Sequence, residues 1–455
     1  MLNTIKNAWR IPDLRKKILY TLLIIVVFRF GSVIPVPFLD ASGLAELMNQ
    51  ASESTALGYI NMLTGGAFSY ASLFAMGITP YINSSIIMQL LTIAIPPLER
   101  LSKEGEEGRK KIATITRYVT VLLGLIQGIA YYVYLRNSSI VKYTAGFTGV
   151  FVGIVIVLCF TAGTALIMWM GEQINEKGIG NGISMILLAG IVARLPVTFG
   201  TVWQYFKLGL ENPSANGKFL ILAPLFIALF LVVIWVIVFM NEAERRIPVQ
   251  YAKKVVGRKM YGGQSSFLPV KVAMSGVMPV IFASSILFVP QFIHFFVKPE
   301  AGTFWAGFFA AFEQTGWVYM LLYFLMIIIF AYFYMSIQYN PLEMANNLRQ
   351  SNGTVPGIRP GKPTADFIAK ILSKVTLIGA LFLAFVALVP MIYTRVTGMA
   401  GLSLGGTSVI IIVGVALETV KQLESQMMMR HYKGFLDGGK ENCDETHSFR
   451  RPRRR

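Results

Sequence analysis

The sequence predicts an all-α polytopic membrane protein, with ten transmembrane helices in two inverted pseudo-symmetric five-helix halves and both termini in the cytoplasm. Hydrophobic residues make up 55% of the 455 residues and charged residues only 14%, whereas an ordinary soluble domain carries about 25% charged residues. The mean hydropathy is +0.59. The apolar residues gather in runs of about 20, the length that one helix needs to cross a bilayer.

Ten such runs follow one another, and each is expected to form one membrane span. They lie near residues 18–36, 74–95, 112–135, 149–170, 181–200, 219–240, 272–297, 317–339, 371–394 and 405–422. No small-residue cleavage site follows the first long run, so we expect no cleavable signal peptide. The chain then divides into a cytoplasmic N-terminus (1–17), a first half (18–200), a second half (201–422) and a basic cytoplasmic tail (423–455).

The distribution of basic residues predicts the orientation of the spans. With the N-terminus inside, 33 of the 41 Lys and Arg residues fall in cytoplasmic segments and 7 in outer segments, while Arg29 lies within the first span. Basic residues near span ends stay in the cytoplasm. The same bias explains the net charge of +18 without a nucleic-acid partner. An odd-numbered repeat inserts its second copy upside down, which favours a functional site between the halves.

The second span contains residues that are unusual in a membrane helix. Pro80 interrupts the backbone hydrogen-bond ladder, and amides and hydroxyls are costly against lipid. Its polar residues include Asn83, Ser84, Ser85 and Gln89. We expect this helix to line a cavity, or to use its small polar residues for helix packing. A half-apolar stretch with paired glycines, residues 61–70, precedes the span. On the third and fourth spans, Gly124/Gly128 and Gly149/Gly153 predict close helix packing.

The sequence gives little support for catalysis, a metal or a cofactor. Gly401–Gly405 matches a nucleophile-elbow pattern, but His431 and His447 are expected on the opposite side of the membrane, and His294 near an outer span end. Cys443 and His447 offer two ligands where structural zinc normally takes four. An intramembrane hydrolase is therefore disfavoured.

Ionisable residues inside the spans weigh against coupled transport. The clear candidates, Arg29, Glu418 and Lys421, lie near span ends, whereas coupled transporters usually bury carboxylates or histidines at mid-membrane depth. A five-plus-five secondary transporter of a small solute remains the alternative interpretation.

Two inward-facing segments, 241–271 and 338–374, are long and basic. Proline and glycine on both sides of Arg359 would hold that arginine at a constrained turn. The positive-inside rule explains the charge but not the length of these loops, so we expect them to dock a cytoplasmic partner.

Eight stretches make the resemblance to a known family specific through their order and spacing. They are Phe28–Pro37, Gly65–Ser69, Gly77–Leu91, Gly171–Ser184, Arg245–Lys254, Pro279–Ile286, Val355–Gly361 and Gly405–Ser408. Across nearly its full length the chain resembles the SecY family, the channel subunits of bacterial protein translocases. The resemblance implies an hourglass channel in the cytoplasmic membrane, made of two halves that open like a clamshell.

Three site elements follow from the resemblance. An apolar pore ring would comprise Ile78, Ile82, Ile183, Leu187, Ile281 and Ile411. Residues four apart share a helix face, which suits the first four of these. A short plug helix near residues 60–73 would contain Gly65, Gly66, Ala67, Phe68 and Ser69. A lateral gate between spans two, three, seven and eight would include Asn83, Ser84, Gln89 and Ser284.

The resemblance also implies partners. Arg245, Arg246 and Arg359 lie on the loops that bind the SecA motor ATPase and the ribosome in this family. SecE and SecG subunits, secretory preproteins and their signal sequences complete the expected set, with no specific nucleic-acid sequence among them. The end of the tail, Cys443–Arg455, departs from the family pattern; we expect a disordered basic segment held near anionic lipids.

Overall fold

The computed structural model describes residues 6–447 except 7, 41, 45–60, 62–63, 144–145, 212–216, 252–253, 257–258, 262–264, 274–275, 295–302, 313–315 and 399–405. Each of the ten predicted runs corresponds to one helix. These helices are α2 (Pro12–Gly31), α5 (Thr79–Ala94), α7 (Glu106–Asn137), α8 (Gly146–Lys177), α9 (Gly182–Glu211), α11 (Lys218–Glu242), α12 (Met278–His294), α14 (Trp317–Gln338), α16 (Lys362–Thr397) and α17 (Gly406–His447).

Length and composition support a polytopic membrane protein. Within the described residues, seven helices are long and apolar enough to cross a membrane. An eighth span results if α5 and α6 (Pro96–Lys103), which meet at a bend of 101°, count as one. The apolar part of α12 is shorter, at Met278–Pro290.

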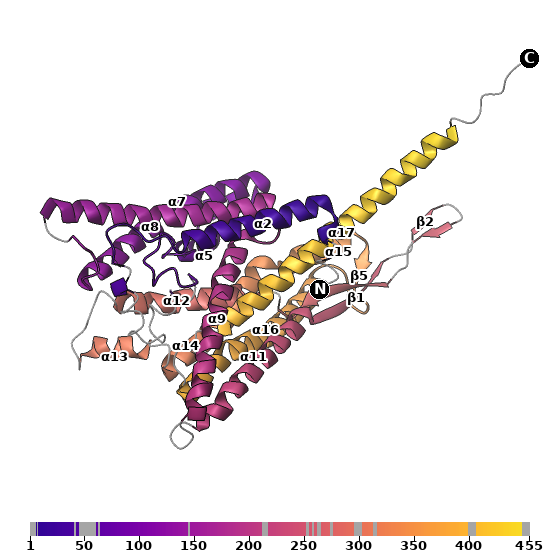
Figure 1. The fold of residues 1–455 in the computed structure, drawn as a ribbon. Coiled ribbons are helices and arrows are strands. Elements are labelled where there is room, and N and C mark those ends of the chain that lie inside the picture. Colours follow the sequence, from indigo (N-terminus) through magenta and orange to yellow (C-terminus); the bar gives the residue numbers. More distant parts are fainter. Residues whose placement is uncertain are drawn as a thin grey trace, which may run out of the picture.

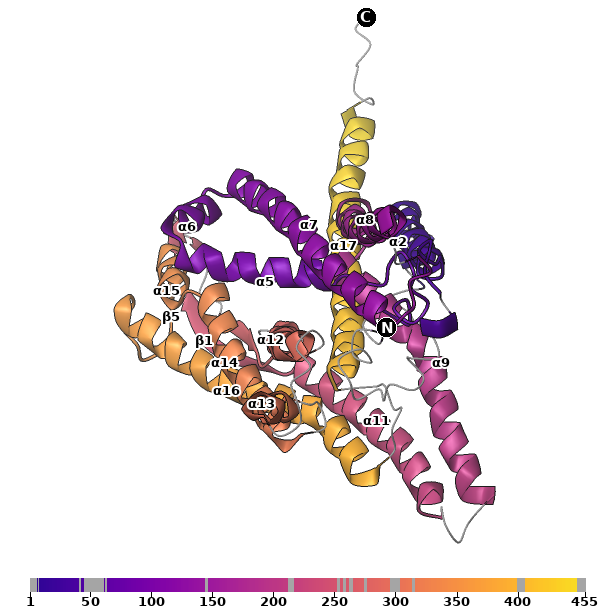
Figure 2. The same cartoon turned by 90° about the vertical axis from the view of Figure 1, so that its left-hand side faces the viewer.

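The helices form two groups that meet along a seam. In the first group α7 packs along α5 and α8, and in the second α14 packs along α12 and α16 (Figure 2). Helix α9 contacts α8 of the first group and α11 and α17 of the second. The first group lies above the second in Figure 2, with α9 and α17 reaching between them.

Small residues bring α7 and α8 together, as the glycine spacing predicts. A Cβ added at Gly124 would lie 3.6 Å from the Thr164 side chain, and one added at Gly128 would lie 3.6 Å from the Val157 carbonyl oxygen. Both are ordinary van der Waals contacts, so the two helices pack closely at these positions, although a methyl group would also fit at either one. The two helices run side by side in Figure 1.

Helix α5 begins later than the predicted span of 74–95. Residues 64–78 form turns with one isolated bridge at Ser72, and the helix begins at Thr79 with Pro80 in its first turn. Proline fits there because the first helical amides have no partner within the helix, so its missing N–H costs nothing. Pro80 therefore starts this helix, and the expectation that it interrupts the ladder within a span is wrong.

The two long cytoplasmic segments contain strands that the sequence analysis did not predict. The strands are β1 (Glu244–Tyr251), β2 (Lys254–Val256), β3 (Lys259–Tyr261), β4 (Ser265–Lys271) and β5 (Gly353–Thr354). β4, β1 and β5 form an antiparallel sheet in that order, and β2 pairs with β3. The signal was the alternation along β1, where Ile247 and Val249 are buried and their neighbours exposed.

Helix α17 continues well past the predicted end of its span at residue 422. It runs to His447 and projects beyond the other helices, at the end of the molecule that also carries the strands (Figure 1). The expected disorder of the tail is therefore wrong for residues 443–447. Residues 448–455 lie outside the described residues.

Candidate functional site

The structure brings all six residues of the predicted ring into one apolar cluster. Ile78, Leu187 and Ile411 are buried in it, with 5%, 5% and 3% of their surface exposed. Partly buried residues packed against this cluster include Ile82, Ile183 and Ile281. Residues that lie more than 300 positions apart in the chain thus share one contact region.

The cluster forms where four helices begin. Ile78 is the N-cap residue of α5, and Ile82 lies one turn further on. Ile183 and Leu187 occupy the first two turns of α9. Ile281 and Ile411 lie in the first two turns of α12 and α17. Because each side chain sits near a helix start, the positions of four helix ends determine the geometry of the cluster.

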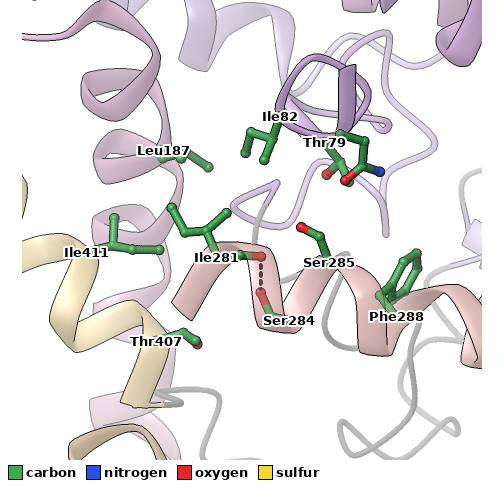
Figure 3. A pocket seen from close by; sticks show the side chains of 10 residues that line it. Thr79, Ile82, Leu187, Ile281, Ser284, Ser285, Phe288, Thr407 and Ile411 are labelled. Carbon is green, nitrogen blue, oxygen red and sulfur yellow. Dashed lines mark hydrogen bonds between the residues drawn. The ribbon is translucent and has the colours of Figure 1, made fainter. Parts of the chain in front are cut away.

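Four of the six side chains also border a cavity, shown in Figure 3. Its lining residues are Thr79, Ile82, Asn83, Leu187, Ile281, Ser284, Ser285, Phe288, Thr407 and Ile411. The cavity encloses about 540 Å³ of empty space, part of it open to solvent. Ile82, Leu187, Ile281 and Ile411 form its apolar end (Figure 3). Such a constriction resists hydration and offers no fixed hydrogen-bond pattern.

The predicted gate residues do not all face the same surface: some line the cavity and one is packed against α7. Asn83 and Ser284 line the cavity, and the Ser284 hydroxyl donates to the Ile281 carbonyl of its own helix at 2.9 Å. Ser84 is fully buried and its hydroxyl donates to the Thr116 carbonyl of α7 at 2.8 Å. Successive helix residues are about 100° apart, so Asn83 and Ser84 cannot face the same partner. Gln89 is half-buried and does not line the cavity.

The cavity contains residues that the sequence analysis missed. Ser285 and Phe288 follow Ser284 on α12, while Thr79 and Thr407 lie at the starts of α5 and α17. Thr79, Ser285 and Thr407 stand inside the family-like stretches, and that is the only sequence signal for them. Their convergence depends on how α5, α12 and α17 pack.

The predicted plug segment is packed into the first group of helices. Its described part is Asn61, which is helical, and residues 64–73, which form turns, so the helix implied by the resemblance is absent from 64–73; residues 60, 62 and 63 lie outside the described residues. Phe68 is 1% exposed, and its ring centroid lies 4.5 Å from that of Tyr131 on α7. The Tyr131 hydroxyl donates to the Phe68 carbonyl at 3.4 Å.

Side-chain bonds also fix the shape of this segment. The Asn61 side-chain oxygen accepts from the Ser69 amide at 3.2 Å, and the Ser69 hydroxyl donates to the Gly66 carbonyl at 2.8 Å. Ala67 is 1% exposed. Gly65 and Gly66 have φ values of +67° and +90°, a left-handed conformation that glycine adopts readily.

The three predicted docking arginines are exposed on the strands and turn of the cytoplasmic segments. Arg245 and Arg246 lie on β1, and Arg246 pairs with Glu244 at 2.8 Å. Arg359 lies in the turn before α16, where its carbonyl accepts a hydrogen bond from the Thr364 hydroxyl at 2.8 Å. Exposed guanidinium groups are suited to carboxylate or phosphate partners.

Strand pairing connects the two segments that carry these arginines. β1 pairs with β5 through Gln250 opposite Thr354, and the Thr354 hydroxyl donates to the Gln250 carbonyl at 3.3 Å. β5 is followed within a few residues by the Arg359 turn, so one small sheet holds both segments on the same end of the molecule. In the described part of the chain, no group of three or more His, Cys, Asp and Glu side chains is arranged to hold a metal ion.

Comparison with known proteins gives consistent results over most of the chain. The family model described as SecY matches residues 72–420. The chain is 44% identical over 446 residues to the protein translocase subunit SecY of Streptomyces coelicolor, covering 96% of this chain and all of the relative. It is 40% identical over 453 residues to the protein of the same name from Mycobacterium bovis, with the same coverage.

The fold resembles solved channel structures. A structure described as a protein conducting channel aligns with a TM-score of 0.62 and 17% identity, covering 91% of this chain and 92% of the other. Sec61 in a canine ribosome-channel complex aligns with a TM-score of 0.60 and 16% identity, at the same coverage. At these identities the likeness concerns the fold alone.

Proposed function

This chain belongs to the SecY family, and on that premise we propose that unfolded polypeptides pass through it at the apolar cluster of Ile78, Ile82, Ile183, Leu187, Ile281 and Ile411. It is a protein translocase channel subunit and a multi-pass protein of the bacterial cytoplasmic membrane. The alternative of a five-plus-five solute transporter is not favoured.

The observation that carries the proposal is the convergence of these six side chains at four helix starts. They come from both groups of helices, so separating the groups widens the constriction. Separation breaks apolar contacts but no hydrogen bonds between the six side chains, and the same side chains can close again around a passing chain. An apolar ring also excludes ions while the channel is empty.

The cavity beside the constriction provides the proposed route towards lipid. Asn83 on α5 lines it together with Ser284 and Ser285 on α12, and the two serines are labelled in Figure 3. In the membrane, hydrogen bonds between such side chains contribute about 0.6–2 kcal/mol each. A gate lined by such side chains can separate at low cost, which suits the release of a signal sequence into the bilayer.

The energy source for transport and the partners of the channel are proposed from the family. The proposal assigns no catalytic role to any residue of this chain, so the driving force comes from a SecA-type motor, a ribosome or the membrane potential. Arg245, Arg246 and Arg359 are the proposed contacts for the motor and the ribosome, because they are exposed on the strand-linked cytoplasmic segments. SecE and SecG are the proposed subunits, and secretory preproteins are the substrates.

The experiment is a site-specific photocrosslink to a secretory chain stalled during export. A photoreactive residue at position 82 lies at the constriction, whereas position 158 on α8 is 57% exposed and does not line the cavity. We expect a signal-sequence-dependent adduct from position 82 and at most a weak one from position 158.

Two results would contradict the proposal in different ways. Export without an adduct at position 82 would exclude the cluster as the path of the polypeptide. A correctly folded, membrane-inserted channel that supports no export with its partners present would count against the channel function itself and would revive the transporter alternative.

A further inference from the structure

The outer end of α2 contacts the plug segment through a charged side chain. The Arg29 guanidinium Nη1 donates to the Gly65 carbonyl at 2.9 Å, across 36 residues of sequence. A hydrogen bond from a charged donor is stronger than one between neutral groups. Simple exposure at a membrane edge explains an arginine that reaches for water, but it does not explain a bond directed back to a buried glycine.

The chain after α2 holds the other end of the segment by backbone pairing. The Val36 amide donates to the Ala71 carbonyl at 2.9 Å, and the Leu73 amide donates to the Ile34 carbonyl at 3.0 Å. The Phe74 ring stacks on the Phe28 ring of α2 at a centroid distance of 5.8 Å. Residues 71–74 are therefore a fixed base, and Arg29 contacts the part of the segment farther from that base in sequence.

The Arg29 contact lies next to a helix of the ring. A Cβ added at Gly65 would lie 2.7 Å from the Gly190 carbonyl oxygen of α9. Gly190 follows Leu187 by three residues, so the two lie on neighbouring turns of the same face of α9. Phe28, which precedes Arg29, belongs to the same apolar cluster as Leu187 and Ile78. The bonded carbonyl thus lies where α2, α9 and the plug segment meet.

We propose that Arg29 is a positioning residue for the plug, and that its bond to the Gly65 carbonyl holds residues 64–70 in the closed position against α9. This regulation rests on the proposed channel function. Outward displacement of the segment breaks the bond, while the backbone pairs at residues 71–73 remain as the pivot. Arg29 consequently sets how often an empty channel opens.

The test measures plug position without any transported polypeptide. Ala67 is buried in the segment, so an Ala67→Cys variant, with Cys159 and Cys443 replaced by serine, reports displacement through its reaction with a membrane-impermeant thiol reagent added outside. Loss of a hydrogen bond from a charged donor predicts a rate increase of roughly ten- to a hundredfold for Arg29→Gln. Arg29→Lys keeps a charged donor and should restore most of the protection.

The matched control is Arg136→Gln, which removes another exposed arginine, near the predicted outer end of α7. Its labelling rate should equal that of the parent. An unchanged rate in Arg29→Gln, or equal increases in Arg29→Gln and Arg136→Gln, would overturn the role of Arg29. Equal increases in Arg29→Gln and Arg29→Lys would overturn it as well.

These outcomes are separate from those of the proposed function. Normal signal-dependent export and a normal adduct at position 82, together with unchanged labelling, would leave the channel standing and remove the proposed role of Arg29. Absence of export from the parent protein, with its partners present, would instead reject the channel, whatever the labelling rates.

Discussion

At the scale of single residues, the candidate constriction depends on apolar side chains whose residue types alone do not indicate a functional site. Ile82 or Ile411 alone would be assigned to a core or a lipid-facing surface. Ile82 stands inside a family-like stretch and Ile411 follows one by three residues, and the structure then shows both in the same cluster. Leu187 is 5% exposed in that cluster, so it contributes apolar packing beside the five isoleucines.

A polar side chain in the constriction should weaken its closed state. Burying an unpaired amide costs about 1–3 kcal/mol, so Ile82→Asn or Ile411→Asn should raise ion leakage through reconstituted empty channels by about tenfold or more. Both variants should also accept defective signal sequences. Ile82→Leu and Ile411→Val are the controls, since they keep the surface apolar. Unchanged leakage and unchanged signal selectivity in the asparagine variants would contradict the assignment.

At the scale of elements, α5 has two polar faces with different tasks. Ser84 bonds to the Thr116 carbonyl and joins α5 to α7 within the first group of helices. Asn83, the preceding residue, faces the cavity and α12 of the second group. The resemblance placed both at the gate, together with the other polar residues of this helix. The direction of each residue around the helix decides which neighbour it meets.

This difference predicts different results for two adjacent alanine substitutions. Ser84→Ala leaves the Thr116 carbonyl without this hydrogen bond and should lower stability by about 1 kcal/mol, measured by thermal unfolding in detergent. Asn83→Ala should leave stability within about 0.5 kcal/mol but change which signal sequences are accepted. A large loss of stability in Asn83→Ala, with no change of selectivity, would show that the two faces have been assigned wrongly.

At the scale of the whole molecule, the strands connect parts that the helices keep apart. β1 follows α11, and β5 precedes α16, yet they pair through Gln250 and Thr354. The exposed arginines of both segments are therefore carried by one small sheet and the turn that follows it, and these strands lie at the end from which α17 projects (Figure 1). A partner that docks there contacts the second half of the channel and can act on its position relative to the first.

Charge reversal on this surface should separate docking from folding. Arg359→Glu should weaken motor-driven export severalfold, because an exposed guanidinium that pairs with carboxylate or phosphate becomes repulsive. Arg109→Glu, at an exposed basic position in the first turn of α7 and outside both docking segments, is the control for net charge alone. Export rates and membrane abundance would be measured for both. Normal export by Arg359→Glu, or equal loss in the two variants, would exclude a specific docking role for Arg359.

The sequence by itself determined the class of protein and the order of its helices. Each of the ten apolar runs corresponds to a helix, and seven of the described helices are long and apolar enough to cross a membrane, because a hydrocarbon-length run of apolar residues can satisfy its backbone only as a helix. The paired glycines at Gly124 and Gly128 predicted the packing of α7 on α8, since small residues allow helices to approach. The motifs also named the six residues of the apolar cluster and identified the family.

Only the tertiary structure decided how these parts are used. The start of α5 at Thr79, the strands within the cytoplasmic segments and the turns at residues 64–73 differ from the expectations, because each depends on contacts with distant segments. The bond from Arg29 to Gly65 and the separate directions of Asn83 and Ser84 have the same origin. Hydropathy reports how far a segment can reach across the membrane. The direction in which each side chain points is set by the packing of helices far apart in the chain.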